Sequence, residues 1–220
     1  MEANRGQVQR SVSTWQQPMP PPGSATRTAL INDIADRILT LGTHRLRVAV
    51  DGRTAAGKTS FGHELAERIA QNGRPVLRAS LDDYKKPWKD RHLYDRESGE
   101  GYYRNAFDYQ ATARHLLEPA GPRGSGACAL CYLDPLTQVD HSSRITQAAQ
   151  DAVLIVDGVF AFRPDINDYW DYRIGLDIDP DSPSNEEPTE TRTGQVSTPK
   201  PYTAPATTSP RTSTSPMSTP

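Results

Sequence analysis

A run of eight residues places two glycines, a lysine and a threonine at the spacing G-x-x-x-x-G-K-[ST], the P-loop or Walker A pattern. Glycine at both ends lets the backbone turn and approach phosphate oxygens, and amides at the start of a following helix surround the anion. Lys58 would reach the β- and γ-phosphates of ATP, which makes it a candidate catalytic residue, and the Thr59 hydroxyl would ligate Mg²⁺. The residues expected to bind the nucleotide are Gly52, Arg53, Thr54, Ala55, Ala56, Gly57, Lys58, Thr59 and Ser60. The alternative is a glycine-rich turn that binds no ligand.

Two acidic residues stand where buried strands are expected to end. Asp157 closes the apolar run VLIVD and is the candidate metal ligand, directly or through water. Its alternative role is to cap a turn with Gly158. Asp82 closes an earlier run and is the candidate group that takes the proton of an acceptor hydroxyl, and its alternative is an exposed turn residue. Asp83 should point elsewhere, because side chains alternate along a strand.

The elements that must position these residues follow from hydrophobic periodicity. Helices are expected over 30–41, over 58–71, and from a cap at Asp108 through Leu117. Short apolar runs predict five strands, at residues 45–51, 75–82, 127–132, 152–157 and 172–178. Strands that alternate with helices indicate an α/β fold with a doubly wound, mainly parallel, five-stranded sheet. Ligands bind at the carboxyl edge of such a sheet, so we expect the glycine-rich run, Asp82 and Asp157 to meet there.

Composition excludes several classes of protein. The chain has 220 residues and a formal net charge of −2, so nothing favours nucleic acid or an anionic membrane as a partner. No apolar run is long enough for a transmembrane helix or a secretory signal, and the cytoplasm is the expected compartment. Cys128 and Cys131 have C-x-x-C spacing without a second pair, and we interpret them as packing thiols rather than a redox or zinc site.

The chain divides into three regions. Residues 1–25 contain clustered prolines and no periodicity, which predicts a disordered leader. Residues 26–179 hold the expected helices and strands and form one domain. Residues 180–220 contain nine of the 19 prolines and no Leu, Ile, Phe or Trp. A segment of this composition buries too little apolar area to offset the entropy of ordering, so we expect a disordered tail.

From Leu46 to Asp179 the chain resembles the phosphoribulokinase/uridine kinase family, and particularly bacterial uridine kinase-like proteins. The resemblance rests on four segments in order: VAVDGRTAAGKTSFGHELA, RASLDDY, EGYYRNAFDY and VLIVDGVFAFRPDINDYWDYRIGLDID. It implies a P-loop kinase fold, ATP and Mg²⁺ as cofactors, and phosphorylation of a nucleoside or similar small alcohol. Pantothenate, ribulose 5-phosphate or another metabolite alcohol is an open alternative to uridine or cytidine.

The resemblance also implies roles for single residues. Asp82 matches the family's base or substrate ligand, and Asp157 matches the acidic residue that aids Mg²⁺, where many members carry Glu. Tyr84 and the segment Tyr102-Tyr103-Arg104 lie where the family handles the acceptor, and aromatic rings there would stack on a base. The alternative is that these aromatics pack the loop.

The C-terminus departs from the family. After YRIGLDID, relatives continue into an arginine-rich helical lid and a further strand, whereas residues 180–220 carry only Arg192 and Arg211 and no helical pattern. A lid excludes water, and an arginine in the transition state contributes about 10³–10⁵ in rate. Two readings stay open: a small-molecule kinase whose turnover is impaired by this tail, and a non-catalytic nucleotide-binding protein or truncated kinase remnant.

Overall fold

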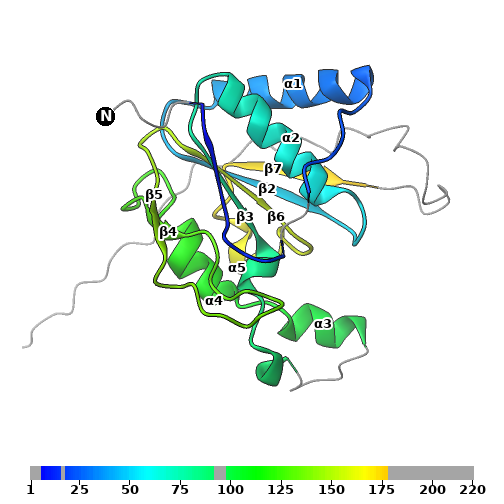
Figure 1. The fold of residues 1–220 in the computed structure, drawn as a ribbon, viewed down its shortest axis with the longest axis vertical. Coiled ribbons are helices and arrows are strands. Elements are labelled where there is room, and N and C mark those ends of the chain that lie inside the picture. The colour runs from blue at the N-terminus through cyan, green and yellow to red at the C-terminus, as the bar shows by residue number, and fades with distance from the viewer. Residues whose placement is uncertain (1–5, 16–17, 92–97, 178–220) are drawn as a thin grey trace, which may run out of the picture.

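The computed structural model describes residues 6–15, 18–91 and 98–177. Its centre is a five-stranded sheet in the order β1-β3-β6-β2-β7, in which every neighbouring pair is parallel (Figure 1). The strands are β1 (Val8–Arg10), β2 (Leu46–Gly52), β3 (Val76–Ser80), β6 (Val153–Asp157) and β7 (Tyr172–Leu176). The predicted α/β fold with a parallel five-stranded sheet is therefore confirmed.

Successive side chains of the central strands point to opposite faces of the sheet, and this divides the core into two layers. Val153 and Ile155 of β6 pack with β2 and with the helices α1 (Ala25–Thr40) and α2 (Lys58–Gln71). Leu154 and Val156 point to the opposite face. The elements on that side are α4 (Tyr109–Thr112), the π-helical turn η3 (Ala113–Leu117), α5 (Pro164–Asn167) and β4 (Ala127–Ala129). Both faces of the sheet are thus covered, as a doubly wound fold requires.

Between β3 and α4 the chain forms short helical turns. They are η1 (Leu81–Tyr84), η2 (Trp88–Asp90) and α3 (Gly99–Asn105). Asp108 caps α4 as predicted, since its Oδ1 accepts a hydrogen bond from the Ala111 amide at 2.8 Å. None of the helices described is long and apolar enough to cross a membrane.

Two sequence predictions about the sheet are wrong. Residues 127–132 do not join it: β4 pairs antiparallel with β5 (Ile145–Gln147) in a separate two-stranded sheet. The fifth strand is β1, within the region predicted to be a disordered leader, and it pairs with β3 from Val8 opposite Val76. Three residues are too short for a periodic signal, and an edge strand forms because β3 offers unpaired backbone groups.

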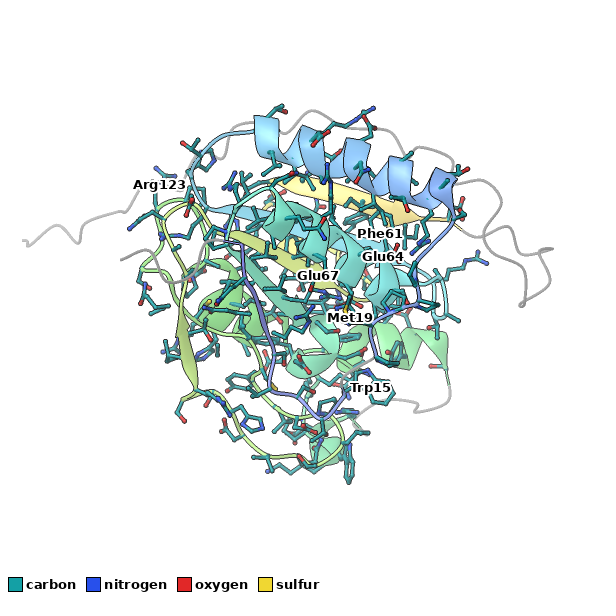
Figure 2. The ribbon with its side chains drawn as sticks, turned by 45° about the horizontal axis from the view of Figure 1, so that its top comes forward. Trp15, Met19, Phe61, Glu64, Glu67 and Arg123 are labelled. Carbon is teal, nitrogen blue, oxygen red and sulfur yellow. The ribbon has the colours of Figure 1, made fainter. Side chains whose placement is uncertain are left out.

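The N-terminal segment is also tethered to α2. Arg10 of this segment forms an ion pair with Glu67, and Arg27 in the first turn of α1 pairs with Glu64 at 2.9 Å. Figure 2 shows Glu64 and Glu67 on α2, with Trp15 and Met19 of the N-terminal segment beside that helix. The predicted tail, residues 180–220, and the lid and final strand expected to be absent from it lie outside the described residues.

Candidate functional site

The glycine-bracketed loop joins the end of β2 to the first turn of α2. At Gly52 a Cβ would lie 2.6 Å from the carbonyl oxygen of Leu176, so only glycine fits between β2 and β7. Gly57 is the N-cap of α2 with a φ of 78°, and a Cβ there would meet nothing within 4 Å. No side chain caps this helix. The amides at its start are therefore open toward an anion, as a phosphate site needs.

Lys58 begins α2 and folds back over the loop. Its Nζ donates to the carbonyl oxygen of Arg53 at 2.6 Å. Burial lowers the pKa of Lys58, and the nearby carboxylates of Asp157, Asp51 and Asp82 oppose that shift. The loop lysine and both sequence-predicted acidic residues therefore share one electrostatic environment at the carboxyl edge of the sheet.

Thr59 and Asp157, the two residues predicted to serve a metal ion, contact each other. The Thr59 hydroxyl donates to Asp157 Oδ2 at 2.6 Å, and Asp157 is 2% exposed. The described residues contain no group of three or more His, Cys, Asp or Glu that could hold a metal by themselves. Mg²⁺ bound to a nucleotide needs only one or two protein oxygens, because phosphates and water complete its shell. The hydroxyl and carboxylate present fit that requirement.

Asp82 and Asp83 take opposite directions after β3. The Ser80 side chain accepts a hydrogen bond from the Asp82 amide at 3.2 Å. The Asp82 side chain is 27% exposed, and its Oδ1 forms an ion pair with Lys85 Nζ at 2.6 Å. Asp83 is 2% exposed, and its burial raises its pKa to about 7, against the lowering effect of the Ser11 and Ser13 hydroxyls. Asp83 is thus buried where Asp82 is partly exposed, but strand alternation is not the reason, because β3 ends at Ser80 and both residues lie in the turn η1.

The residues predicted to contact the acceptor do not lie together. Tyr84 has no exposed surface, and its hydroxyl donates to the Ala129 carbonyl oxygen at 2.5 Å. A substrate contact at Tyr84 is therefore wrong, because the ring belongs to the core. Tyr103 packs edge-on against Phe160, with ring centroids 5.0 Å apart. Arg104 is exposed and pairs with Glu100 one helical turn earlier, so it serves the surface of α3.

Tyr102, from the segment expected to handle the acceptor, lines a cavity beside the loop, together with Phe160 and Phe162, which sequence reasoning missed. Tyr102, Phe160 and Phe162 border an open cavity of about 860 Å³ together with residues 51–54, Val159 and residues 175–177. Tyr102 packs against Phe160 at 5.9 Å between centroids, and Asp82 contributes to the raised pKa of Tyr102, although burial is the larger cause. The segments EGYYRNAFDY and VFAF did signal an aromatic surface, but not which ring would face the loop.

Asp51 was also missed, although it directly precedes the glycine-rich run. Its carboxylate accepts from three backbone amides, those of Gly52 at 2.6 Å, Phe160 at 3.1 Å and Phe162 at 2.9 Å. Phe160 has a φ of 66°, which is strained for a non-glycine residue. Asp51 thus ties the segment after β6 to the P-loop. It holds Phe160 and Phe162 in place, and these two residues and Tyr102 form the aromatic wall of the cavity.

Arg78 was missed as well. It lies in β3, is 3% exposed, and its Nη2 donates to Asp157 Oδ1 at 2.7 Å. A buried arginine in an otherwise apolar strand is unusual unless it is paired, and this was the available signal. The carboxylate of Asp157 therefore has a partner on each oxygen.

The chain is similar to known proteins in sequence and in fold. No family model matches the chain. A curated uridine kinase from Leuconostoc citreum (strain KM20) is 24% identical over 145 residues, which cover 64% of this chain and 66% of that relative, just under two thirds of its length.

Solved structures show the same fold. A candidate uridine kinase from Bacillus stearothermophilus superposes with a TM-score of 0.58 at 25% identity, over 68% of this chain and 80% of that one. A candidate fructose transport system kinase from Silicibacter sp. TM1040 has a TM-score of 0.54 at 18% identity, over 71% of this chain and 76% of that one. In sequence and in fold, the chain is therefore similar to uridine kinase-like P-loop kinases.

Proposed function

We propose that this protein transfers the γ-phosphoryl group of ATP to a hydroxyl of a nucleoside, uridine or cytidine in kind, or of a similar small metabolite. The observation that carries the proposal is the joint placement of two half-sites on one edge of the sheet. Lys58 and Thr59 begin a helix without a side-chain cap, and the Asp82 carboxylate is close enough to oppose the lowering of the pKa of Lys58. The P-loop residues 51–54 border the cavity that Tyr102, Phe160 and Phe162 also line. The similarity to kinases named for uridine and for fructose transport supports transfer to a small molecule.

On the phosphate side, the loop amides and Lys58 hold the triphosphate. The amides at the start of α2 point at the anion, and Lys58 exchanges its bond to the Arg53 carbonyl for a phosphate oxygen. Thr59 and Asp157 are the residues that would hold Mg²⁺, which supplies charge neutralisation on the phosphates when bound.

On the acceptor side, Asp82 orients the hydroxyl and takes its proton. The hydroxyl oxygen forms the new P–O bond, its proton moves to the Asp82 carboxylate, and ADP leaves with the electrons of the bond broken at the γ-phosphorus. The ion pair with Lys85 keeps Asp82 in place while leaving it partly exposed. Tyr102 and Phe160 offer aromatic faces on which a nucleobase would stack.

The composition of residues 180–220 favours a second candidate, a protein that binds nucleotide without transfer. This segment carries two arginines and no helical apolar pattern, so it lacks the features of an arginine-rich lid. Such a protein would keep the phosphate half-site and bind ATP with Mg²⁺.

Calorimetry with ATP and Mg²⁺, followed by a coupled assay for ADP release over a panel of acceptors, separates these functions. The panel contains uridine, cytidine, a purine nucleoside, fructose, pantothenate and ribulose 5-phosphate. Acceptor-dependent ADP release supports the kinase, and its ranking identifies the acceptor. Binding without release on any acceptor supports the second candidate. A folded protein that takes up no nucleotide at millimolar concentration overturns both.

A further inference from the structure

Arg78 places a buried positive charge behind the phosphate site. Its side chain is 3% exposed and lies where β3, β6 and the first turn of α2 meet. Burying a guanidinium is unfavourable unless it is paired and hydrogen-bonded, so a cation in this position needs specific partners. Asp157, which is equally buried, supplies the opposite charge.

The guanidinium contacts three elements at once. Nη2 donates to Asp157 Oδ1 at 2.7 Å and approaches the Thr59 carbonyl oxygen at 3.5 Å. Nη1 donates to the Ala79 carbonyl oxygen and approaches that of Ile155 at 3.4 Å. A planar group held by β3, β6 and α2 has one orientation, and it imposes that orientation on the carboxylate it binds.

The Arg78–Asp157 bond decides which carboxylate oxygen faces the P-loop. Because Oδ1 is occupied by Arg78, Oδ2 is the oxygen that meets the Thr59 hydroxyl at 2.6 Å. Free rotation of an unpaired carboxylate would remove this arrangement. The geometry that Thr59 and Asp157 present therefore depends on Arg78.

Gly62 provides the space for this arginine. It lies inside α2, where glycine is among the poorest helix formers. A Cβ at Gly62 would lie 2.7 Å from Arg78 Nη2 and 3.0 Å from its Cζ. The helix therefore has a residue without a side chain at the point where the guanidinium passes.

We propose that Arg78 is a positioning residue: it fixes the carboxylate of Asp157 toward Thr59 and thereby sets the affinity for nucleotide in the presence of Mg²⁺. The proposal rests on the proposed function, since it assumes that nucleotide binds at this loop. Arg78 itself touches neither nucleotide nor acceptor in this role and acts through Asp157.

The first test measures ATP affinity by calorimetry with Mg²⁺ and with EDTA, for the full chain and for Arg78→Met and Arg78→Lys. Changes in residues that orient metal ligands typically reduce metal affinity about 10- to 100-fold. We expect Arg78→Met to lower affinity by this factor with Mg²⁺ and to change it little in EDTA. Arg78→Lys keeps the charge without the planar fork, so partial recovery is expected.

The second test uses Gly62→Ala, which keeps the Arg78–Asp157 charges but displaces the guanidinium. Gly62→Ala alone should reduce the Mg²⁺-dependent affinity. In the Arg78→Met background, where the guanidinium is gone, the same change should leave that affinity unaltered. If Arg78→Met fails to fold, Gly62→Ala alone, measured with Mg²⁺ and with EDTA, carries the test, because it retains the buried pair; a loss of affinity confined to Mg²⁺ supports the positioning role, and thermal melting identifies folded variants.

The outcomes separate the two proposals. If the unaltered chain binds nucleotide with Mg²⁺ and both Gly62→Ala and the folded Arg78 variants keep that affinity, the role of Arg78 is refuted and the proposed function stands. If Arg78→Met weakens binding equally with Mg²⁺ and with EDTA, Arg78 only supports the fold and the positioning role is refuted. If the folded, unaltered chain binds no nucleotide, the proposed function fails, and this inference fails with it.

Discussion

The two sides of the proposed site are built in different ways. The proposed phosphate side is one continuous segment, the loop from Gly52 to the first turn of α2, and most of the donors it would offer are backbone amides. The proposed acceptor side would draw on η1, which carries Asp82, and on α3 and the segment after β6, whose Tyr102 and Phe160 border the cavity.

The difference shows what each side depends on. Backbone donors need only the right turn and a helix, so a short motif in the sequence specifies them. Side chains from distant segments need tertiary contacts, such as the carboxylate of Asp51 that holds the amides of Phe160 and Phe162. Changes on the two sides should therefore affect different measurements.

The largest expected effect is on turnover, from Asp82→Asn on the acceptor side. Removing a general base lowers the rate by about 10²- to 10⁴-fold, while nucleotide binding on the other side should stay the same. Steady-state kinetics on the best acceptor and calorimetry with ATP check both parts. A matching loss of ATP affinity would contradict the separation, because it would place Asp82 among the phosphate ligands.

A stability effect is expected from the buried carboxyl of Asp83. Its pKa is raised to about 7, so the folded state keeps the proton that the unfolded chain loses near pH 4. The stabilisation is complete below about pH 4 and is lost as pH rises to about 7, a change of about 4 kcal/mol at 1.36 kcal/mol per pH unit.

Urea unfolding of the unaltered chain and of Asp83→Asn from pH 4 to pH 8 measures this effect. The isosteric amide carries no charge at any pH, so the variant should lack this decline and should gain stability relative to the unaltered chain as pH rises. Two parallel stability curves would show that Asp83 does not titrate in this range.

On the phosphate side, Lys58→Ala should weaken nucleotide binding. A hydrogen bond to a charged group contributes about 1.5–3 kcal/mol, which corresponds to a loss of about 10- to 150-fold in affinity. The matched control is Lys86→Ala, which removes an equal charge from a side chain that contacts Asn105. Equal losses from the two variants in calorimetry would mean that the effect is one of net charge and not of the loop.

The smallest expected effect distinguishes the aromatic wall from the surface of α3. Tyr102→Ala removes a stacking face worth about 0.5–1.5 kcal/mol and should raise the KM for the acceptor by about 2- to 10-fold. Arg104→Ala removes an exposed i,i+4 pair with Glu100 and should leave that KM within about twofold. The reverse order would restore Arg104 as the acceptor contact.

The sequence predicted the parts of the fold that have long periodic patterns. The helix predicted over 58–71 is found. The strands predicted at 45–51, 75–82, 152–157 and 172–178 are found with shifted ends, at 46–52, 76–80, 153–157 and 172–176. The run at 127–132 was misassigned to the main sheet because a short apolar run does not reveal its partner. β1 was missed because three residues are too few to show a hydrophobic period, and its pairing with β3 depends on tertiary structure.

The candidate site divides in the same way. Thr59 and Asp157 come together because their positions follow from strand order and a local motif. The role of Tyr84 was predicted wrongly, because a tyrosine that follows two aspartates can face a ligand or pack in the core. Tertiary packing determines which, and here the ring is buried. Arg78 could have been noticed as a charge inside a buried strand, but its partner is 79 positions away in the chain and no local rule connects them.

The strand order has a consequence for how the chain acquires its shape during synthesis. Of the four neighbouring pairs in the described sheet, β1 with β3 is the one whose members both precede β6. On a ribosome that adds about 5–20 residues per second, β1 waits about 3–14 s for Val76 to emerge opposite Val8. The central strand β6 arrives later and must insert between β3 and β2. The outer pair of strands is thus the first whose members are both synthesised, and the facing edges of β3 and β2 lack their partner until β6 inserts between them.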